Sequence, residues 1–176
     1  MTDPVDVIKY CPKCGSPEFF PDNEKSFTCG GCGFNFYVNS AAAVAALIFN
    51  EKGELLLTRR ALNPNKGMLD LPGGFVDPDE KVEDAVIREI NEELNLEVTS
   101  LRYLVSWPNR YIFSGYTVFT IDLGFVCEVK TFDGIGFHDD ISGYEFIAPH
   151  KIDNTQICSE SIRQIIDFYR RDTGKK

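Results

Sequence analysis

The chain has 176 residues, of which 43% are hydrophobic and 26% are charged, and its formal net charge is −9. This length and composition predict one globular domain with a sizeable core and room for a small appendage. The acidic charge argues against a broad surface for the phosphate backbone of nucleic acids, which needs clustered lysine and arginine.

The sequence carries no sign of a membrane or secretory segment. It has no run of about 18 or more apolar residues, so we expect no membrane span. The first residues lack the basic region and the apolar core of a signal peptide. We therefore expect a cytoplasmic protein whose six cysteines stay reduced. In that setting, paired CxxC motifs favour metal binding over disulfides.

Two CxxC motifs near the N-terminus predict a zinc ribbon over residues 1–38, ahead of a main domain at 39–176. Two such turns can bring four thiolates around Zn²⁺, which favours a metal site over chance pairs or redox dithiols. The four cysteines leave no position for a water, so the zinc is expected to be structural. A ribbon can also dock or dimerise, which leaves a homodimer among the expected assemblies. The predicted ligands are Cys11, Cys14, Cys29 and Cys32.

The rest of the chain is predicted to alternate between strands and helices. The first two strands are joined by a turn at 50–54 and predict a hairpin. The glycines after Pro72 predict backbone that can approach a ligand closely. We expect strands at 41–49, 55–59, 68–71, 98–105, 116–129 and 143–147, and helices at 77–94 and 159–171.

The helix at 77–94 has acidic residues where packing alone would not place them. Asp77, Pro78 and Glu80 predict its start through a capping box. On a wheel at about 100° per residue, Glu89 and Glu93 fall inside the apolar arc. Carboxylates four residues apart repel each other, and a charge against an apolar face costs free energy. Bound Mg²⁺ or Mn²⁺ resolves the conflict, because hard cations take carboxylate oxygens and bridge to phosphates.

The segment from Gly74 to Leu96 resembles the Nudix box, Gly-x5-Glu-x7-Arg-Glu-U-x-Glu-Glu-x-Gly-U, in which U is a bulky aliphatic residue. Asn95 stands where the family has glycine. Because asparagine tolerates the left-handed conformation that ends a helix, we expect no harm to the site. The resemblance implies an α/β fold, the Nudix α/β/α sandwich around a mixed sheet. The matching residues are Gly74, Glu80, Arg88, Glu89, Glu92 and Glu93.

The resemblance also implies hydrolysis of a nucleoside diphosphate linked to another moiety. By position, Glu89, Glu92 and Glu93 match the acids that bind Mg²⁺ or Mn²⁺, and Arg88 matches the residue that orients them. Gly73 or Gly74 can offer a carbonyl to the metal, which would lower the pKa of an attacking water. Glu89 or Glu92 is the expected proton acceptor. A further acid from a downstream loop serves the family, and the candidates are Asp139, Asp140 and Glu145.

A four-cysteine ribbon before a Nudix domain is similar in layout to the NADH pyrophosphatase branch. That branch carries Ser-Gln-Pro-Trp-Pro-Phe-Pro-x-Ser after the box, of which this chain keeps only Ser-Trp-Pro at 106–108. NADH, ADP-ribose, other dinucleotides, nucleotide sugars and capped RNA ends therefore stay open as substrates. Arg59 and Arg60 are candidate phosphate contacts, and Trp107 and Tyr111 could stack on a base. Surface solubility and core packing are the competing accounts.

Three functions compete, and an enzyme acting on a small nucleotide is the leading one. A protein that binds a nucleotide without cleaving it would be expected to have lost box carboxylates, yet all four glutamates are present. A nucleic-acid-binding ribbon is disfavoured by the acidic chain and the few basic residues of the ribbon. Those basic residues are Lys9, Lys13 and Lys25.

Overall fold

The computed structural model describes residues 2–138 and 140–173, and the chain divides into two compact units. One unit holds the N-terminal residues up to Ser40 together with Arg110–Phe119, and the other holds Ala41–Asn109 with the chain from Thr120 onward. The proposed domain boundary at residue 38 stays a prediction. None of the helices in the described ranges is long and apolar enough to span a membrane.

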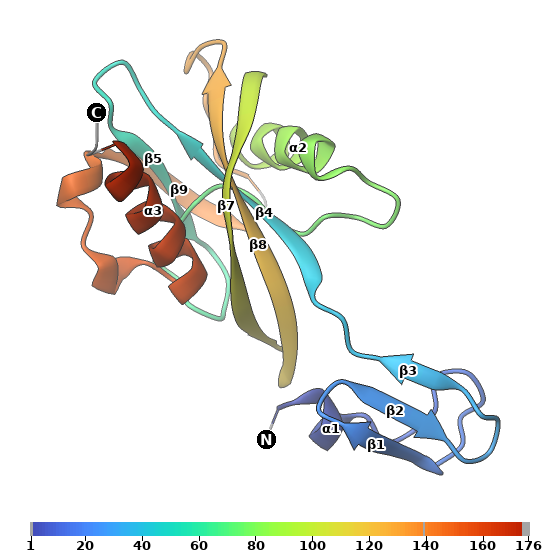
Figure 1. Ribbon diagram of the computed structural model, residues 1–176. Coiled ribbons are helices and arrows are strands. Elements are labelled where there is room, and N and C mark those ends of the chain that lie inside the picture. Colours follow the sequence, from blue (N-terminus) through green and yellow to red (C-terminus); the bar gives the residue numbers. More distant parts are fainter. Residues whose placement is uncertain (1, 139, 174–176) are drawn as a thin grey trace. The chain divides into compact units, whose positions relative to one another are not determined.

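The N-terminal unit is a small antiparallel sheet of order β1-β2-β3 (Figure 1). Its core is small: the rings of Phe19 and Phe27 stack at 5.0 Å between centroids, next to the buried Cys11 and Cys29. The amide of Thr117 donates to the carbonyl oxygen of Thr2 at 2.7 Å, which joins residues 110–119 to the chain start. The elements of this unit are α1 (Pro4–Val7), β1 (Phe19–Asn23), β2 (Ser26–Cys29) and β3 (Asn35–Tyr37).

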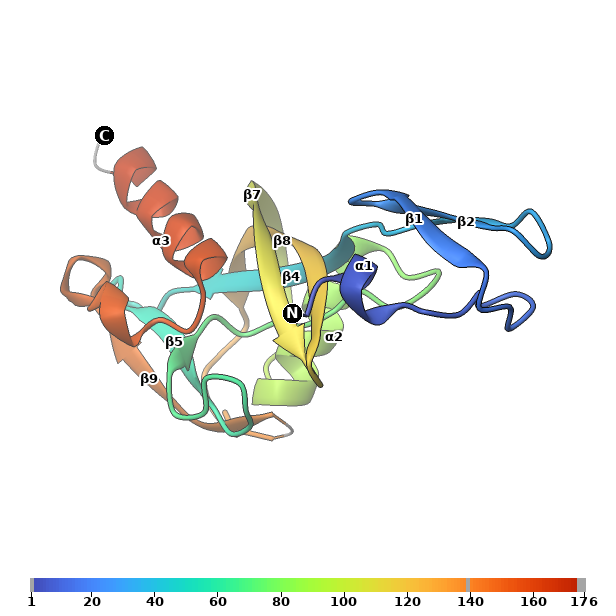
Figure 2. The same cartoon turned by 90° about the horizontal axis from the view of Figure 1, so that it is seen from below.

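The larger unit places two three-stranded sheets between two helices (Figures 1 and 2). One sheet has the order β4-β8-β7 with β4 parallel to β8, and the other has the antiparallel order β6-β5-β9. This arrangement confirms the predicted α/β/α sandwich with mixed strands. The elements are β4 (Ala41–Ile48), β5 (Leu55–Arg60), β6 (Leu69–Asp70), α2 (Val82–Leu94), β7 (Val98–Phe113), β8 (Tyr116–Val129), β9 (Ile141–Ile147), the short 3-10 helices η1 (Pro149–Lys151) and η2 (Asn154–Gln156), and α3 (Glu160–Thr173).

Strand β4 is apolar throughout because both of its faces are covered. Val44, Ala46 and Ile48 pack with the apolar side of α2. Ala45 and Leu47 point to the opposite core, which contains Ile165 and other residues of α3. Since successive side chains of a strand alternate between its faces, a strand covered on both faces needs a continuous apolar run. The same alternation in β5 places Leu56 in the core beside α2 and places Leu55 and Leu57 in the core beside α3.

The predicted hairpin between the first two strands of this unit is wrong. β4 and β5 belong to different sheets and share only the isolated bridge Phe49↔Leu55 within the described residues. β5 lies between β6 and β9, while β4 lies between β8 and the segment 72–76. Each strand already has a partner on both edges, so neither has an edge left for the other.

The helix predicted at 77–94 is shorter at its start. α2 begins at Val82 with Lys81 as the N-cap residue, and the chain before it forms a turn in which Asp79 has a φ of 64°. The capping-box contact is present, because the Asp77 amide donates to Glu80 Oε2 at 2.9 Å. Glu80 also binds Arg88, and this contact holds the turn outside the helix. The predicted end at Leu94 is confirmed.

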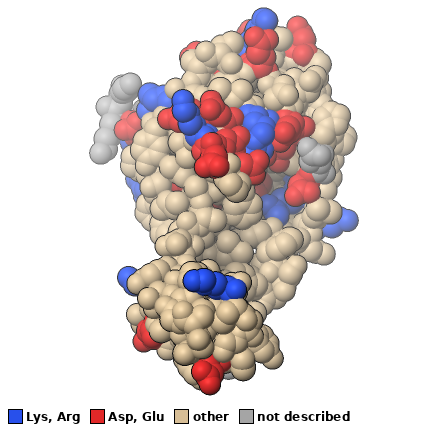
Figure 3. All heavy atoms as spheres, turned by 90° about the vertical axis from the view of Figure 1, so that its right-hand side faces the viewer, with Lys and Arg blue, Asp and Glu red and all other residues tan. Residues whose placement is uncertain are grey.

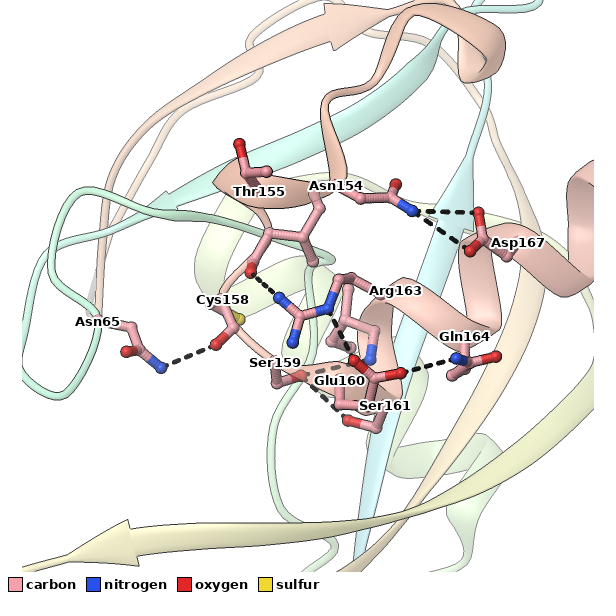
Figure 4. A network of polar contacts seen from close by, with 12 residues as sticks. Asn65, Asn154, Thr155, Cys158, Ser159, Glu160, Ser161, Arg163, Gln164 and Asp167 are labelled. Carbon is pink, nitrogen blue, oxygen red and sulfur yellow. Dashed lines mark hydrogen bonds and ion pairs between the residues drawn. The ribbon is translucent and has the colours of Figure 1, made fainter.

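Helix α3 is fixed at its start by polar contacts (Figure 4). Ser159 precedes the helix, and its hydroxyl accepts the Ile162 amide at 3.3 Å, as an N-cap side chain does. Arg163 donates to the Ile157 carbonyl at 3.2 Å, and Asn65 donates to the Cys158 carbonyl at 2.9 Å. These bonds attach the loop before β6 and the chain after η2 to the helix that covers the second core.

Candidate active site and metal centre

The four cysteines of the N-terminal unit form one cluster whose thiol atoms all lie within 4.8 Å of one another. The Sγ atoms of Cys11 and Cys32 are 3.8 Å apart, and those of Cys14 and Cys29 are 3.7 Å apart. A tetrahedron with Zn–S bonds of about 2.3 Å has edges of about 3.8 Å. The geometry therefore fits a metal held by four thiolates, as the CxxC spacing predicted.

The two cysteine turns are built alike. Gly15 donates its amide to the Cys11 carbonyl at 2.8 Å, and Gly33 donates to the Cys29 carbonyl at 2.9 Å. In each turn the first cysteine also donates its own amide to the carbonyl of the residue five positions later. This repeated backbone pattern gives the two turns the same hydrogen-bonded shape, as expected of two CxxC turns that share one metal.

In the larger unit, the segment 72–76 runs along the free edge of β4. The amides of Ala46 and Val44 donate to the carbonyls of Pro72 and Gly74, both at 2.8 Å. A Cβ on Gly73 would lie 2.1 Å from the Val44 oxygen, and one on Gly74 would lie 2.5 Å from Glu89 Oε1. Only glycine fits at Gly73, where the obstacle is backbone, while a Cβ on Gly74 would require the end of the Glu89 side chain to move. The glycine backbone thus lies against an acid of α2.

Arg88 binds three carboxylates and one carbonyl at once. Its Nε and Nη2 atoms donate to the two oxygens of Glu80, both at 2.8 Å. Its Nη1 atom donates to Glu89 at 2.8 Å and to Glu92 at 3.1 Å, and Nη2 also donates to the Phe75 carbonyl at 3.0 Å. All five N–H groups of the guanidinium are thus used. The hydrogen bonds from Arg88 lower the pKa of Glu80 to about 2.

Glu93 lies apart from Arg88 and is 8% exposed. Its Oε2 atom accepts the Gly73 amide at 3.1 Å. Burial raises the pKa of Glu93 to about 8, and the charges of Glu89, Asp70 and Asp140 contribute in the same direction. Burial also raises the pKa of Glu89, even though Arg88 contacts it. Carboxyl groups gathered in this way are the environment that a cation compensates.

The burial of the three box acids follows the helical wheel. The side chain of Glu89 is 16% exposed, that of Glu92 is 49% exposed, and Glu93 is buried. Figure 3 shows acidic side chains gathered around basic ones on the face of the larger unit that carries α2. One edge of the acidic group therefore reaches solvent, while Glu93 is enclosed beside the glycine segment.

Of the two downstream acids that the structure describes, Asp140 is the one whose charge contributes to the raised pKa of Glu93. Glu145 forms an ion pair with Arg59, and Asp139 lies outside the described residues. The sequence did not single out Asp70, whose carboxylate pairs with Arg60 at 3.0 Å and also contributes to the raised pKa of Glu93. Asp70 directly precedes the Leu-Pro-Gly-Gly turn, and this position in the sequence could have indicated that it lies near the site.

The four residues predicted to bind substrate are spread over the fold. Arg59 donates to the Gly67 carbonyl at 2.6 Å, and Arg60 pairs with Asp70. Trp107 packs against the core that α3 covers. Tyr111 belongs to the N-terminal unit, where its ring stacks on Phe113 at 6.1 Å between centroids. Of the four, Arg60 is the one linked to the acidic group, through Asp70.

The raised pKa of Glu93 has a consequence for stability. In buffer without divalent cations, we expect the free energy of unfolding to fall as the pH rises from 4.5, the usual value for a glutamate, to about 8. Between these values the folded chain binds more protons than the unfolded chain, so a rise in pH favours unfolding. Urea titrations between these two pH values measure the slope.

Glu93→Gln should weaken this slope, whereas Glu83→Gln, at an exposed position on the same helix, should leave it unchanged. Equal slopes in the wild type and in Glu93→Gln would show that Glu93 does not hold its proton in the folded chain.

Residues 39–167 match the family of the NUDIX domain. The NAD-capped RNA hydrolase NudC of Pseudomonas fluorescens is 27% identical over 163 residues, covering 92% of this chain and 55% of that protein. An ADP-ribose pyrophosphatase of Methanocaldococcus jannaschii is 44% identical over 79 residues, covering 44% of this chain and 46% of that protein. The chain spans about half the length of these curated relatives.

The crystal structure of a NUDIX hydrolase from Nitrosomonas europaea has the same fold. It matches with a TM-score of 0.73 at 22% identity, over 95% of this chain and 94% of that one. The match of the domain over most of the chain, the box residues around Arg88 and the sandwich of two sheets agree with one another. The chain belongs to the Nudix family.

Proposed function

We propose that the chain is a hydrolase that cleaves the pyrophosphate linkage of a nucleoside diphosphate joined to another moiety, using Mg²⁺ or Mn²⁺. The observation that carries this proposal is the burial of Glu89 and Glu93 beside Asp70 and Asp140, with a raised pKa at both glutamates. Burying carboxylates lowers the stability of the fold, and a bound cation that also contacts an anionic ligand compensates this cost.

The residues that would hold the cation are Glu89, Glu92 and Glu93, with the Gly73 carbonyl as a further ligand. The carbonyls of Pro72 and Gly74 are engaged by β4, which favours Gly73 over Gly74. When bound, the cation supplies charge neutralisation at the pyrophosphate and lowers the pKa of a water. Arg88 fixes Glu89 and Glu92 through its Nη1 atom, so both carboxylates are oriented before any ligand arrives.

A proton acceptor must be reached by the attacking water. The carboxylate of Glu92 is 49% exposed and that of Glu89 is 16% exposed, whereas Glu93 is enclosed. We therefore assign proton transfer to Glu92 or Glu89 and cation binding to all three. Asp140, whose charge reaches Glu93, is the proposed additional acid. Arg60 and Arg59 are the proposed phosphate contacts, with Arg60 the one tied to the acidic group through Asp70.

ADP-ribose and NADH are the first substrates to test. The name of one relative mentions ADP-ribose, and the name of another mentions NAD-capped RNA. The first matches over less than half of its length and the second at 27% identity. The assay is a panel of NADH, NAD⁺, ADP-ribose, diadenosine polyphosphates, nucleotide sugars and nucleoside triphosphates, with Mg²⁺, with Mn²⁺ and with EDTA.

We expect metal-dependent cleavage of one class in the panel and no cleavage with EDTA. A folded protein that binds Mn²⁺ yet cleaves none of these compounds would contradict the proposal. Such a result would instead favour a nucleotide-binding protein without hydrolysis.

We also propose that Cys11, Cys14, Cys29 and Cys32 hold one structural Zn²⁺. The sulfur separations near 3.8 Å support this, because they equal the edges of a zinc tetrahedron. With four thiolates in place, no coordination position is left for a water, which separates this centre from the hydrolytic one.

A further inference from the structure

The connection between β8 and β9 is bonded to the C-terminal end of α2. The amide of Gly136 donates to the Leu94 carbonyl at 3.1 Å, and the amide of His138 donates to the Glu93 carbonyl at 3.0 Å. Carbonyls in the last turn of a helix have no partner inside the helix. The connection therefore satisfies the end of the helix that carries the acids.

Asn95 adds a side-chain bond to this junction. Its backbone adopts the left-handed conformation, with φ 54° and ψ 37°, and its own amide closes on the Asn91 carbonyl at 2.8 Å. Its side-chain Nδ2 atom donates to the Gly134 carbonyl at 3.2 Å. The sequence predicted only that asparagine would tolerate the backbone conformation. A glycine at this position would end the helix equally well but would lack the bond to Gly134.

The same connection carries Asp140. Its carbonyl accepts the Ala61 amide at 2.7 Å, which fixes that end of the connection to the chain just after β5. Asp140 follows two positions after His138, whose amide is bonded to the Glu93 carbonyl, and its charge contributes to the raised pKa of Glu93. The connection is thus held at the end of α2 by Gly134, Gly136 and His138, and held again at Asp140, beside the acidic group.

We propose that Asn95 is a positioning residue, whose side-chain amide ties the β8–β9 connection to α2 and so sets the position of the Asp140 carboxylate relative to Glu93. This inference rests on the proposed function, because it assigns Asp140 to the cation site of that reaction. It gives the departure from the family glycine a role in the site.

The test is a double-mutant cycle on Mn²⁺ binding. Binding is measured in zinc-loaded protein from the electron paramagnetic resonance signal of the free Mn²⁺. Asn95→Gly keeps the left-handed backbone and removes only the amide, so the helix is expected to stay folded. Loss of one hydrogen bond should weaken Mn²⁺ binding about fivefold. Asp140→Asn should weaken it as well, and the double variant should bind no worse than Asp140→Asn alone.

Equal effects of Asn95→Gly in the wild type and in Asp140→Asn would overturn the proposal, because they would mean that Asn95 does not act through Asp140. The matched control is Thr131→Ala, which removes a local hydrogen bond to the Asp133 amide, 3.0 Å long, in the same connection without touching α2. This control should keep the wild-type affinity for Mn²⁺.

Hydrogen exchange measures the tie itself. In Asn95→Gly, the amides of Gly136 and His138 should exchange about fivefold faster, and unchanged exchange would refute the tie. Neither exchange nor Mn²⁺ binding needs a substrate, so a wild type that binds Mn²⁺ but cleaves nothing refutes the proposed function alone. Where ADP-ribose or NADH is cleaved, kcat should fall in Asn95→Gly and in Asp140→Asn, and it should fall no further in the double variant than in Asp140→Asn. KM should stay within about twofold of the wild type.

Discussion

Glu93→Gln is expected to lower kcat for metal-dependent pyrophosphate hydrolysis by on the order of 10²- to 10³-fold. The glutamine amide keeps the size of the side chain, and its oxygen can still accept the Gly73 amide. It supplies no negative charge for a cation, however, and charged carboxylate oxygens are the ligands that hard cations such as Mg²⁺ prefer. The measurement is a steady-state assay against the best substrate of the panel across a range of Mg²⁺ concentrations.

The same change should raise the melting temperature of the protein at neutral pH in EDTA. Burial makes the ionised form of Glu93 costly, and glutamine removes that cost without leaving a cavity. Loss of activity together with a gain in stability would show that Glu93 serves function and does not stabilise the fold. Glu83→Gln, which replaces an exposed acid in the first turn of α2, should keep the wild-type kcat and should not raise the melting temperature, because an acid there favours the helix dipole. Near-wild-type kcat in Glu93→Gln would remove Glu93 from the cation site.

The parts of the site that could be predicted from the sequence are those fixed by local spacing. The 3.6-residue period of α2 placed Glu89 and Glu93 on the apolar side, and the structure buries Glu93 and partly buries Glu89 there. The CxxC spacing likewise predicted the cysteine cluster. Within α2 and within each CxxC turn the residues are only a few positions apart, so local backbone geometry brings their side chains together. The two CxxC turns are 15 to 21 positions apart, and it was their repeated motif that predicted that they would meet.

The parts that escaped prediction depend on contacts between distant segments. The Asn95 amide finds a partner 39 positions away in Gly134, and Asp70 meets Arg60 through the pairing of β6 with β5. The early start predicted for α2 failed because the Asp77–Glu80 bond closes a separate turn before the helix, and Arg88 holds Glu80 in that turn.

The extension of β7 to Phe113, by contrast, could have been found. Ser114 and Gly115 both have positive φ and form a two-residue turn between two apolar runs.

Removal of zinc should unfold the N-terminal unit while the larger unit stays folded. Among the described residues, the buried core of that unit consists of Phe19, Phe27, Cys11 and Cys29, with a few partly buried apolar side chains packed against it. So small a core does not offset the entropy of ordering the chain, whereas a structural zinc contributes about 10–16 kcal/mol. Cys29→Ser is the direct test, because Cys29 is buried and serves both as a proposed ligand and as a core residue.

We expect about one zinc per chain in the wild type and a large loss of bound zinc in Cys29→Ser, measured by elemental analysis. The amide of Phe27 should then lose its protection from hydrogen exchange, and so should that of Thr117, which donates to the Thr2 carbonyl in the same unit. The amides of Ala46 and Val44, which bind the glycine segment beside the acids, should keep theirs.

Cys127→Ser provides the control, since Cys127 is a buried cysteine of the larger unit and should leave the zinc content unchanged. Full protection of Phe27 in zinc-free protein would mean that hydrophobic packing alone holds this unit together. Loss of zinc without loss of Thr117 protection would mean that the strand tips at 110–119 are ordered independently of the cysteine cluster. The expected pattern instead makes the metal the main source of order in the N-terminal unit, because so small an apolar core cannot supply it.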